Sequence, residues 1–167
     1  KRQEYTLQAL PLSQSWDEGR GKFGDNPKVV NGVSWENRNN YPGSTAVTWS
    51  QVRNPSSGSA GSSYYTGSGY ESSQSFSYES PDVNMDVTTV VENWLGAPRV
   101  TTKIPNNGFI LRFSGSQETD NIKFGQMKFF SSKTHTIYSP RLEVRWDDHI
   151  ACSGSNTGSL NKLNLSG

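Results

Sequence analysis

The amino-acid sequence predicts an all-β fold: an antiparallel β-sandwich or jelly roll with one short helix and long loops rich in Ser, Gly and Asn. Two observations lead to this prediction. Apolar residues come in short bursts that are separated by turn-forming residues. Ser, Gly, Asn and Thr make up 67 of the 167 residues, whereas hydrophobic residues account for only 31%. Since no internal repeat of about 20–50 residues is evident, we expect one module over residues 1–167.

The N-terminal part predicts three strands. Residues 5–12 alternate apolar and polar positions until Pro11 breaks the register. The following residues, 13–27, are rich in glycine and charge and are expected to form a loop. Two short strands are predicted at residues 33–35 and 46–49, on either side of an Asn-rich turn at residues 37–40.

A long loop is predicted at residues 54–77, where Gly and Ser dominate. Such tracts are usually flexible linkers. Aromatic residues interrupt this one, so we expect a partly ordered loop within one module and not a domain boundary. Tyrosines among small residues make adaptable recognition loops. Tyr64, Tyr65 and Tyr70 are therefore the candidate ligand-binding residues, acting through surface contacts.

One short helix is predicted at residues 86–95. Its apolar residues follow the spacing i, i+3, i+4, i+7, i+8 of one helical face. They are Val87, Val90, Val91, Trp94 and Leu95. Asp86 or Thr88 is expected to cap the start, and Gly96 followed by Pro98 to end the helix. We expect one or two turns that pack across the end of a sheet.

The last third predicts strands at residues 109–113, 124–130 and 142–146. In the last of these, Leu142, Val144 and Trp146 alternate with charged residues, which predicts one buried and one solvated face. Residues 153–167 form a polar C-terminal extension.

Charge and composition exclude several classes of protein. The formal net charge is +1, which offers no electrostatic footprint for nucleic acid. No apolar run approaches the ~18–20 residues of a membrane span, and no signal peptide is visible. The single Cys makes neither an internal disulfide nor a Cys-based zinc site. We expect no cofactor, nucleic acid or membrane partner.

The sequence also argues against catalysis. His135 and His149 are the two histidines, and no nucleophile-elbow motif accompanies them. We interpret His135 as part of a loop and His149 as a surface residue. Cys152 has no basic neighbour, so it is not expected to be reactive. No P-loop or dinucleotide fingerprint is present, and we predict no catalytic residues and no enzyme activity.

Loop carboxylates leave a calcium site as an open alternative. Asp17 and Glu18 precede a Gly-rich loop, which is able to bring both to one cation. Asp147 and Asp148 point to opposite faces if their strand continues. No EF-hand spacing supports a metal, so solvated carboxylates are the preferred interpretation.

Five tryptophans lie within alternating or helical apolar patterns, which favours core packing. They are Trp16, Trp35, Trp49, Trp94 and Trp146. The alternative is a sugar-stacking platform of exposed rings on a β-sandwich.

Five segments, in order, resemble DNRLRE-type (disaggregatase-related) β-sandwich modules. The first is YTLQALPL followed by SQSWDEG, and the second is NGVSW. The third is DVTTVVENW, which is similar to the family's "l-D-V-T-x-x-V-x-x-W". The fourth is GFIL, and the fifth combines FFSSK with SPRLEV. These segments are residues 5–19, 31–35, 86–94, 108–111, and 129–133 with 139–144.

A narrower resemblance is carried by the stretches PLSQSW, THTIY and RWDD, which are residues 11–16, 134–138 and 145–148. With them, the chain resembles virion structural proteins of tailed bacteriophages, particularly large contractile-tailed phages of marine bacteria. That resemblance implies a non-catalytic module in a neck, tail or baseplate-associated protein, located in the virion. Its partners would be other virion proteins or symmetry copies of itself. The broader family implies the alternative of a carbohydrate-binding module on a secreted or cell-surface protein, with a glycan as ligand.

The chain departs from the family pattern at its start. The family's opening strands, with motifs like "R-x-L-l-x-F-d-l" and "A-x-L-x-l", do not precede Tyr5. We therefore expect a segment of a longer chain that lacks its first strands. Unpaired sheet edges would then be completed by upstream residues or by a neighbouring subunit, through strand addition.

Overall fold

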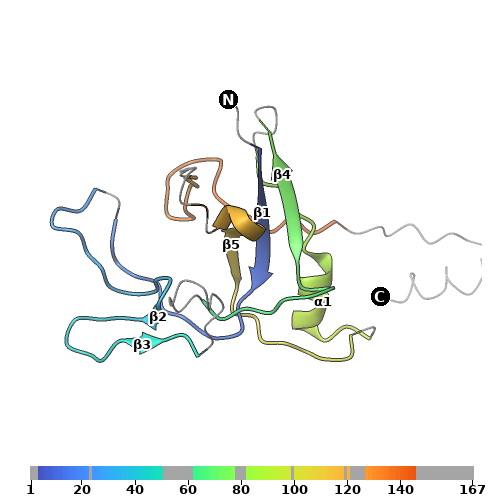
Figure 1. Cartoon of the computed structure of the whole chain (residues 1–167), viewed down its shortest axis with the longest axis horizontal. Helices are drawn as coiled ribbons and strands as arrows, with labels where there is room; N and C mark the ends of the chain where they lie inside the picture. Colours follow the sequence, from blue (N-terminus) through green and yellow to red (C-terminus); the bar gives the residue numbers. More distant parts are fainter. Residues whose placement is uncertain are drawn as a thin grey trace, which may run out of the picture. The chain divides into compact units, whose positions relative to one another are not determined.

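A computed structural model describes residues 4–22, 24–50, 62–77, 82–98, 100–118, 120 and 127–145. The chain divides into two compact units, Lys1–Phe124 and Gly125–Gly167. The elements of the first unit, in chain order, are β1 (Tyr5–Pro11), β2 (Asn37–Asn39), β3 (Val47–Thr48), β4 (Ser72–Phe76), α1 (Thr88–Leu95), β5 (Phe109–Phe113) and the 3₁₀ helix η1 (Gly115–Glu118) (Figure 1).

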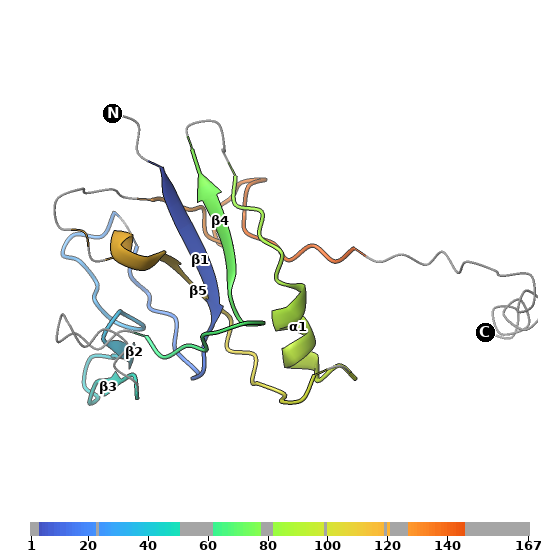
Figure 2. The same cartoon turned by 45° about the vertical axis from the view of Figure 1, so that its right-hand side comes forward.

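The first unit is built on a three-stranded antiparallel sheet in the order β4-β1-β5 (Figures 1 and 2). In the register, Leu7 of β1 lies opposite Gln74 of β4 and Phe113 of β5. β1 is the central strand, so both of its edges are paired. Leu7 and Ala9 point to one face of the sheet and Leu10 to the other, and all three are buried. The strands predicted at residues 5–12 and 109–113 are confirmed as β1 and β5. The described part of the chain is thus mostly β with one short α-helix, as the all-β prediction requires.

The second sheet pairs β2 with β3 in antiparallel orientation. The predicted strand at residues 33–35 and turn at residues 37–40 are wrong, because the turn comes earlier. The Ser34 hydroxyl accepts a hydrogen bond from the Asn37 N–H at 3.0 Å, and the Ser34 N–H donates to the Asn37 carbonyl at 2.7 Å. These bonds close the turn at residues 34–37 and release Asn37–Asn39 to form β2.

Strand β4 corrects the prediction of a loop over residues 54–77. Its sequence, SSQSF, has little intrinsic preference for a strand. It is held by the backbone ladder to β1 and by a 2.9 Å hydrogen bond between the hydroxyls of Thr6 and Ser75. The ring of Phe76 also stacks on Tyr5, with 5.3 Å between centroids. Residues 54–61 of the predicted loop lie outside the described residues.

Helix α1 confirms the predicted helix and its C-terminal end at Gly96. The predicted start is wrong, because the helix begins at Thr88 and its N-cap residue is Val87, which makes no side-chain cap hydrogen bond. The Asp86 carboxylate accepts hydrogen bonds from the Thr88 N–H at 2.9 Å and from the Thr88 hydroxyl at 2.6 Å. Gly96 adopts φ +70°, and its N–H donates to the Glu92 carbonyl at 2.9 Å. This left-handed conformation is one that glycine adopts without strain.

The buried face of α1 is narrower than predicted. Val90 and Asn93 are buried, whereas Leu95 is 72% exposed. Trp94 packs on Phe109, the first residue of β5, with 4.8 Å between ring centroids. Because Asn93 also donates to the carbonyl of Gly69, just before β4, the helix covers one end of the sheet, as predicted (Figure 2).

The main hydrophobic cluster lies on one face of the sheet. It consists of Leu10, Leu12, Trp49 and Tyr64, with Ile110 packed against it. Tyr64 enters this cluster because it forms a β-bridge with Leu12 just beyond β1. Segments far apart in the sequence therefore meet at the end of β1.

The second unit is described over residues 127–145, where no helix or strand is assigned. The described parts of the strands predicted at residues 124–130 and 142–146 are therefore wrong as strands. No other described strand pairs with them, and a strand without a hydrogen-bonded neighbour is not stable in water. The expected buried face is wrong as well, since Leu142 and Val144 are 57% and 67% exposed.

Several predictions fall on residues outside the described part of the chain. They are Trp146, Asp147, Asp148, His149, Cys152 and the extension at residues 153–167.

Candidate functional site

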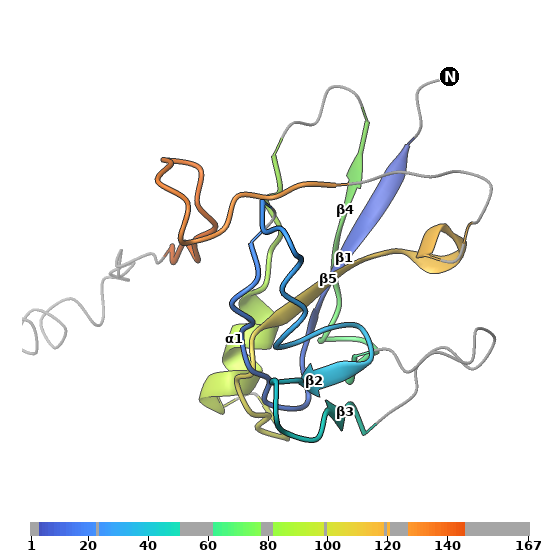
Figure 3. The same cartoon turned by 90° about the vertical axis from the view of Figure 1, so that its left-hand side faces the viewer.

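The first unit carries an open, mostly apolar cavity of about 280 Å³ beside β5. We call it the β5 groove. Its lining residues come from β5 itself, from the segment before β2, from the residue after β3, and from the two segments that meet at the end of β1. They are Leu12, Trp16, Val33, Ser34, Trp35, Trp49, Ser62, Phe109, Ile110 and Leu111. In Figure 3, β5 and the β2–β3 sheet both face the viewer.

Three tryptophans line the β5 groove, and backbone carbonyls hold two of them. The indole N–H of Trp16 donates to the Asn107 carbonyl at 2.8 Å, and that of Trp49 donates to the Ser34 carbonyl at 3.0 Å. Trp49 is only 4% exposed, but Trp16 and Trp35 are 38% and 36% exposed. The prediction of core packing is confirmed for Trp49 and is wrong for Trp16 and Trp35. These two stand in loop segments that no second layer covers among the described residues.

The outer edge of β5 forms part of the groove. The ladder to β1 continues in the hydrogen bonds from Leu12 N–H to the Gly108 carbonyl and from Ser114 N–H to the Thr6 carbonyl. Backbone groups alternate sides along an antiparallel strand. Those of Phe109 and Leu111 must therefore point away from β1, toward the outer edge. No strand among the described residues pairs with that edge.

The far end of this edge is closed by a side chain. The Phe113 N–H, which also points outward, donates to the Glu118 carboxylate at 2.7 Å. The open stretch of the edge is thus the part that contains Phe109 and Leu111, and both residues line the β5 groove.

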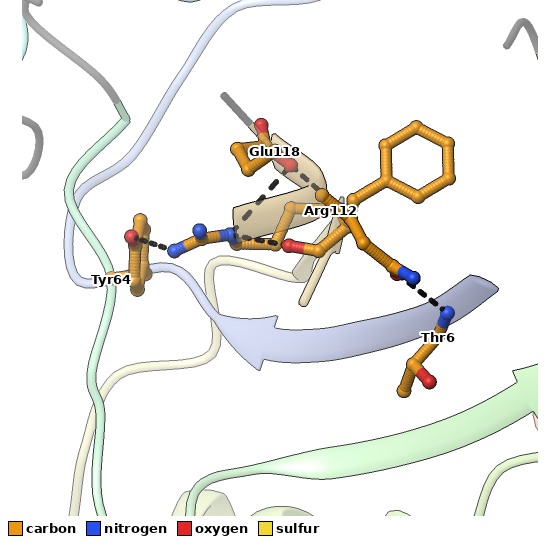
Figure 4. Close-up of polar contacts among 6 residues, drawn as sticks. Thr6, Tyr64, Arg112 and Glu118 are labelled. Carbon is orange, nitrogen blue, oxygen red and sulfur yellow. Dashed lines mark hydrogen bonds and ion pairs between the residues drawn. The ribbon is translucent and has the colours of Figure 1, made fainter. Parts of the chain in front are cut away.

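A polar network holds β5 against the rest of the unit (Figure 4). The Arg112 guanidinium donates to the Tyr64 hydroxyl at 2.6 Å, and its Nε lies 3.9 Å from the Glu118 carboxylate. From the same 3₁₀ helix, Gln117 accepts a hydrogen bond from the Thr6 N–H at 2.9 Å. These contacts fix the orientation of β5 and η1. The sequence did not predict these contacts, because Arg112 and Tyr64 are 48 residues apart and Thr6 and Gln117 are 111 residues apart. The contacts between β5 and Glu118 of η1 are the local ones.

Ser62 gives the groove a polar group that lacks a partner. It is 3% exposed, and its hydroxyl makes no hydrogen bond with any described residue. Leaving a buried polar group unpaired costs about 1–3 kcal/mol.

The tyrosines predicted to make surface contacts lie elsewhere. Tyr64 is 3% exposed and belongs to the hydrophobic cluster, so the prediction is wrong for this residue. Tyr65 and Tyr70 are half-buried and stack on each other, with 5.5 Å between centroids. None of the three lines the β5 groove.

The remaining candidates are not brought together into a site. His135 is exposed in the second unit. The Asp17 carboxylate accepts a hydrogen bond from the Asn39 amide at 2.5 Å. Within the described ranges, no cluster of three or more His, Cys, Asp and Glu side chains is arranged to hold a metal ion. Nor does any described helix have the length and apolar character needed to cross a membrane.

Comparison of the chain with protein-family models, with curated proteins and with solved structures finds no match.

Proposed function

We propose that this chain is a non-catalytic structural module of a bacteriophage particle, part of a neck, tail or baseplate-associated protein. It acts through subunit packing and strand pairing with other virion proteins or with symmetry copies of itself. The observation that carries the assembly role is the outer edge of β5, which lies open beside an apolar groove. The assignment to a phage particle is supported by the resemblance of residues 11–16, 134–138 and 145–148 to virion proteins.

The proposal includes completion of the fold by added strands. Among the described residues, the β4-β1-β5 sheet has no partner strand on either outer edge. Exposed strand edges are templates for pairing with another chain. We propose that strands from neighbouring subunits or from further sequence complete a β-sandwich or jelly roll around this sheet.

Exposed apolar side chains support an assembly role in both units. Val30 is 80% exposed in the first unit, and Ile137 is 83% exposed in the second. In the second unit, Phe130 and Tyr138 are 53% and 68% exposed and stack on each other, with 6.1 Å between centroids. Apolar side chains that gather into an exposed patch mark surfaces that become buried on association.

Two measurements test the proposal. Sedimentation velocity over a hundredfold concentration range should show that the chain associates, either with itself or with a purified virion protein. Mass spectrometry of density-purified particles should detect the chain as a stoichiometric component. A chain absent from the particles would overturn the virion assignment.

A second candidate function is carbohydrate binding. The observation in its favour is that Trp16 and Trp35 are partly exposed and line the same groove. Ring faces of this kind stack on the apolar faces of sugars. The groove is less suited to a sugar in its polar groups, because only two of its ten lining residues, Ser34 and Ser62, carry a hydroxyl and none is charged. A glycan array, with Trp35→Ala as control, tests this alternative.

A further inference from the structure

We propose that the β5 groove accepts residues 141–145 of a second copy of this chain as an added β-strand. The inference rests on the proposed assembly function and names the partner segment and the acceptor site. The added strand pairs with the outward backbone groups of Phe109 and Leu111. Leu142 and Val144 then insert into the groove beside Trp16 and Trp35.

The groove has the chemistry that an extended peptide needs. Strand addition takes its affinity from main-chain hydrogen bonds and its specificity from pockets for alternate side chains. The outer edge of β5 offers the hydrogen bonds, and eight of the ten lining residues offer an apolar pocket. The cavity of about 280 Å³ is just below the usual range of small-molecule pockets, ~300–1,000 Å³.

Residues 141–145 have the pattern of a strand but no partner. Their sequence, RLEVR, alternates charged and apolar side chains, and Pro140 precedes it. Leu142 and Val144 are 57% and 67% exposed, and no strand of the described chain pairs with them. Arg145 is paired with Glu143 at 2.8 Å, on the alternate positions. The two apolar side chains are therefore on the face opposite this ion pair and are available to enter a groove.

The charges beside the β5 groove also favour residues 141–145 as the added strand. Each exposed groove tryptophan is followed at once by acidic residues: Trp16 by Asp17 and Glu18, and Trp35 by Glu36. All three acidic residues are exposed. The proposed donor segment begins and ends with arginine. Because Arg145 already pairs with Glu143, Arg141 is the side chain that meets these carboxylates, at the rim of the groove. Arg38 is a positive charge in the same region. Its guanidinium donates hydrogen bonds to the backbone carbonyl and the hydroxyl of Ser15, and these bonds hold it at Ser15.

A second copy is therefore the preferred occupant, because every copy carries both the acceptor edge and the donor segment. Such a contact is heterologous: it joins different surfaces of the two partners and is able to build rings or filaments. Repeated subunits of that kind are what a particle component requires.

The test uses one acceptor variant and one donor variant of the full chain. Leu111→Pro removes an outward N–H without removing a bond to β1, because β1 bonds to the alternate residues of β5. Its matched control, Leu111→Ala, shortens the side chain and keeps the N–H. The donor variant is Leu142→Asp with Val144→Asp. Its matched control places the same two charges nearby, at Ile137 and Tyr138, which are 83% and 68% exposed.

Sedimentation velocity then separates the proposed strand addition from association through other surfaces. We expect the wild type to self-associate, and both variants to lose at least tenfold in association constant, with smaller losses in the controls. Mixing the two variants should restore a complex, since each supplies what the other lacks. Raising the salt from about 0.05 M to about 0.5 M should weaken association.

Other outcomes overturn the inference. If the wild type associates and both variants associate equally well, this acceptor and donor are wrong while the assembly function stands. If the wild type is monomeric at every concentration, the second copy is excluded, and particle mass spectrometry alone decides the proposed function. If Leu111→Pro fails to fold by circular dichroism, competition by a synthetic peptide of residues 139–145 replaces it, and a peptide without effect contradicts the proposal.

Discussion

Replacing Leu10 with alanine tests whether the cluster at the end of β1 is the main source of stability. Leu10 is 1% exposed and packs with Leu12, Trp49 and Tyr64. The change removes three carbon atoms, each worth about 0.8 kcal/mol of transfer free energy. A cavity that relaxes only partly adds to this loss, as in other Leu→Ala substitutions, which cost about 2.7–5.0 kcal/mol. We expect the free energy of unfolding to fall by about 3–4 kcal/mol.

Urea denaturation followed by tryptophan fluorescence measures this change, because Trp49 belongs to the same cluster. The matched control is Leu95→Ala, the same substitution at a site that is 72% exposed, where we expect a change within about 0.5 kcal/mol. The slope of unfolding free energy against urea should stay constant in both variants. A loss below about 1 kcal/mol for Leu10→Ala, or equal losses at the two sites, would refute the assignment of the core.

Three further changes test local features. Two hydrogen bonds from Thr88 lower the pKa of Asp86 below its usual value of 3.8. The bond from the Thr88 hydroxyl has the larger effect, and the bond from the Thr88 N–H has the smaller one. Its stabilising contribution is thus present above about pH 4 and is lost as the pH falls through the folded-state pKa. Asp86→Ala should lower the thermal midpoint at pH 7, and the gap should close in acid; a gap independent of pH contradicts this cause. Arg112→Met should cost about 1–2 kcal/mol by urea denaturation, because it removes the bond to a buried hydroxyl. The exposed pair of Arg145 serves as control, and Arg145→Met should leave the midpoint unchanged. Gly96→Ala should cost about 1 kcal/mol, since φ is +70° there, whereas Gly24→Ala, with no atom within 4 Å of the added carbon, should cost less; equal costs would exclude a role for the left-handed turn.

The described contacts also suggest why the proposed acceptor edge stays in place without a partner. Arg112 and Glu118 hold β5 from the side of the sheet that faces Tyr64, and Glu118 occupies the outward N–H at the end of the strand. The open stretch is consequently short. A short open edge limits non-specific pairing with other chains and still offers backbone groups to one specific added strand.

Local patterns in the sequence were sufficient to predict β1, β5 and α1. In β1 and β5, apolar residues alternate with a period of two, and in α1 they recur on one helical face between Asp86 and Gly96. These signals depend on neighbours within a few residues. The C-terminal end of α1 at Gly96 was predictable for the same reason, because such a cap acts over one turn.

Tertiary structure decided the rest. β4 is a run of polar residues that becomes a strand only because β1 lies beside it. Trp16, Trp35 and Trp49 look alike in local sequence, yet only Trp49 is buried, since it alone reaches the cluster formed by Leu12 and Tyr64. Residues 141–145 carry a clear strand pattern and form no strand in the described chain. Burial and strand pairing depend on which distant segments come into contact, and local sequence patterns do not specify those tertiary contacts.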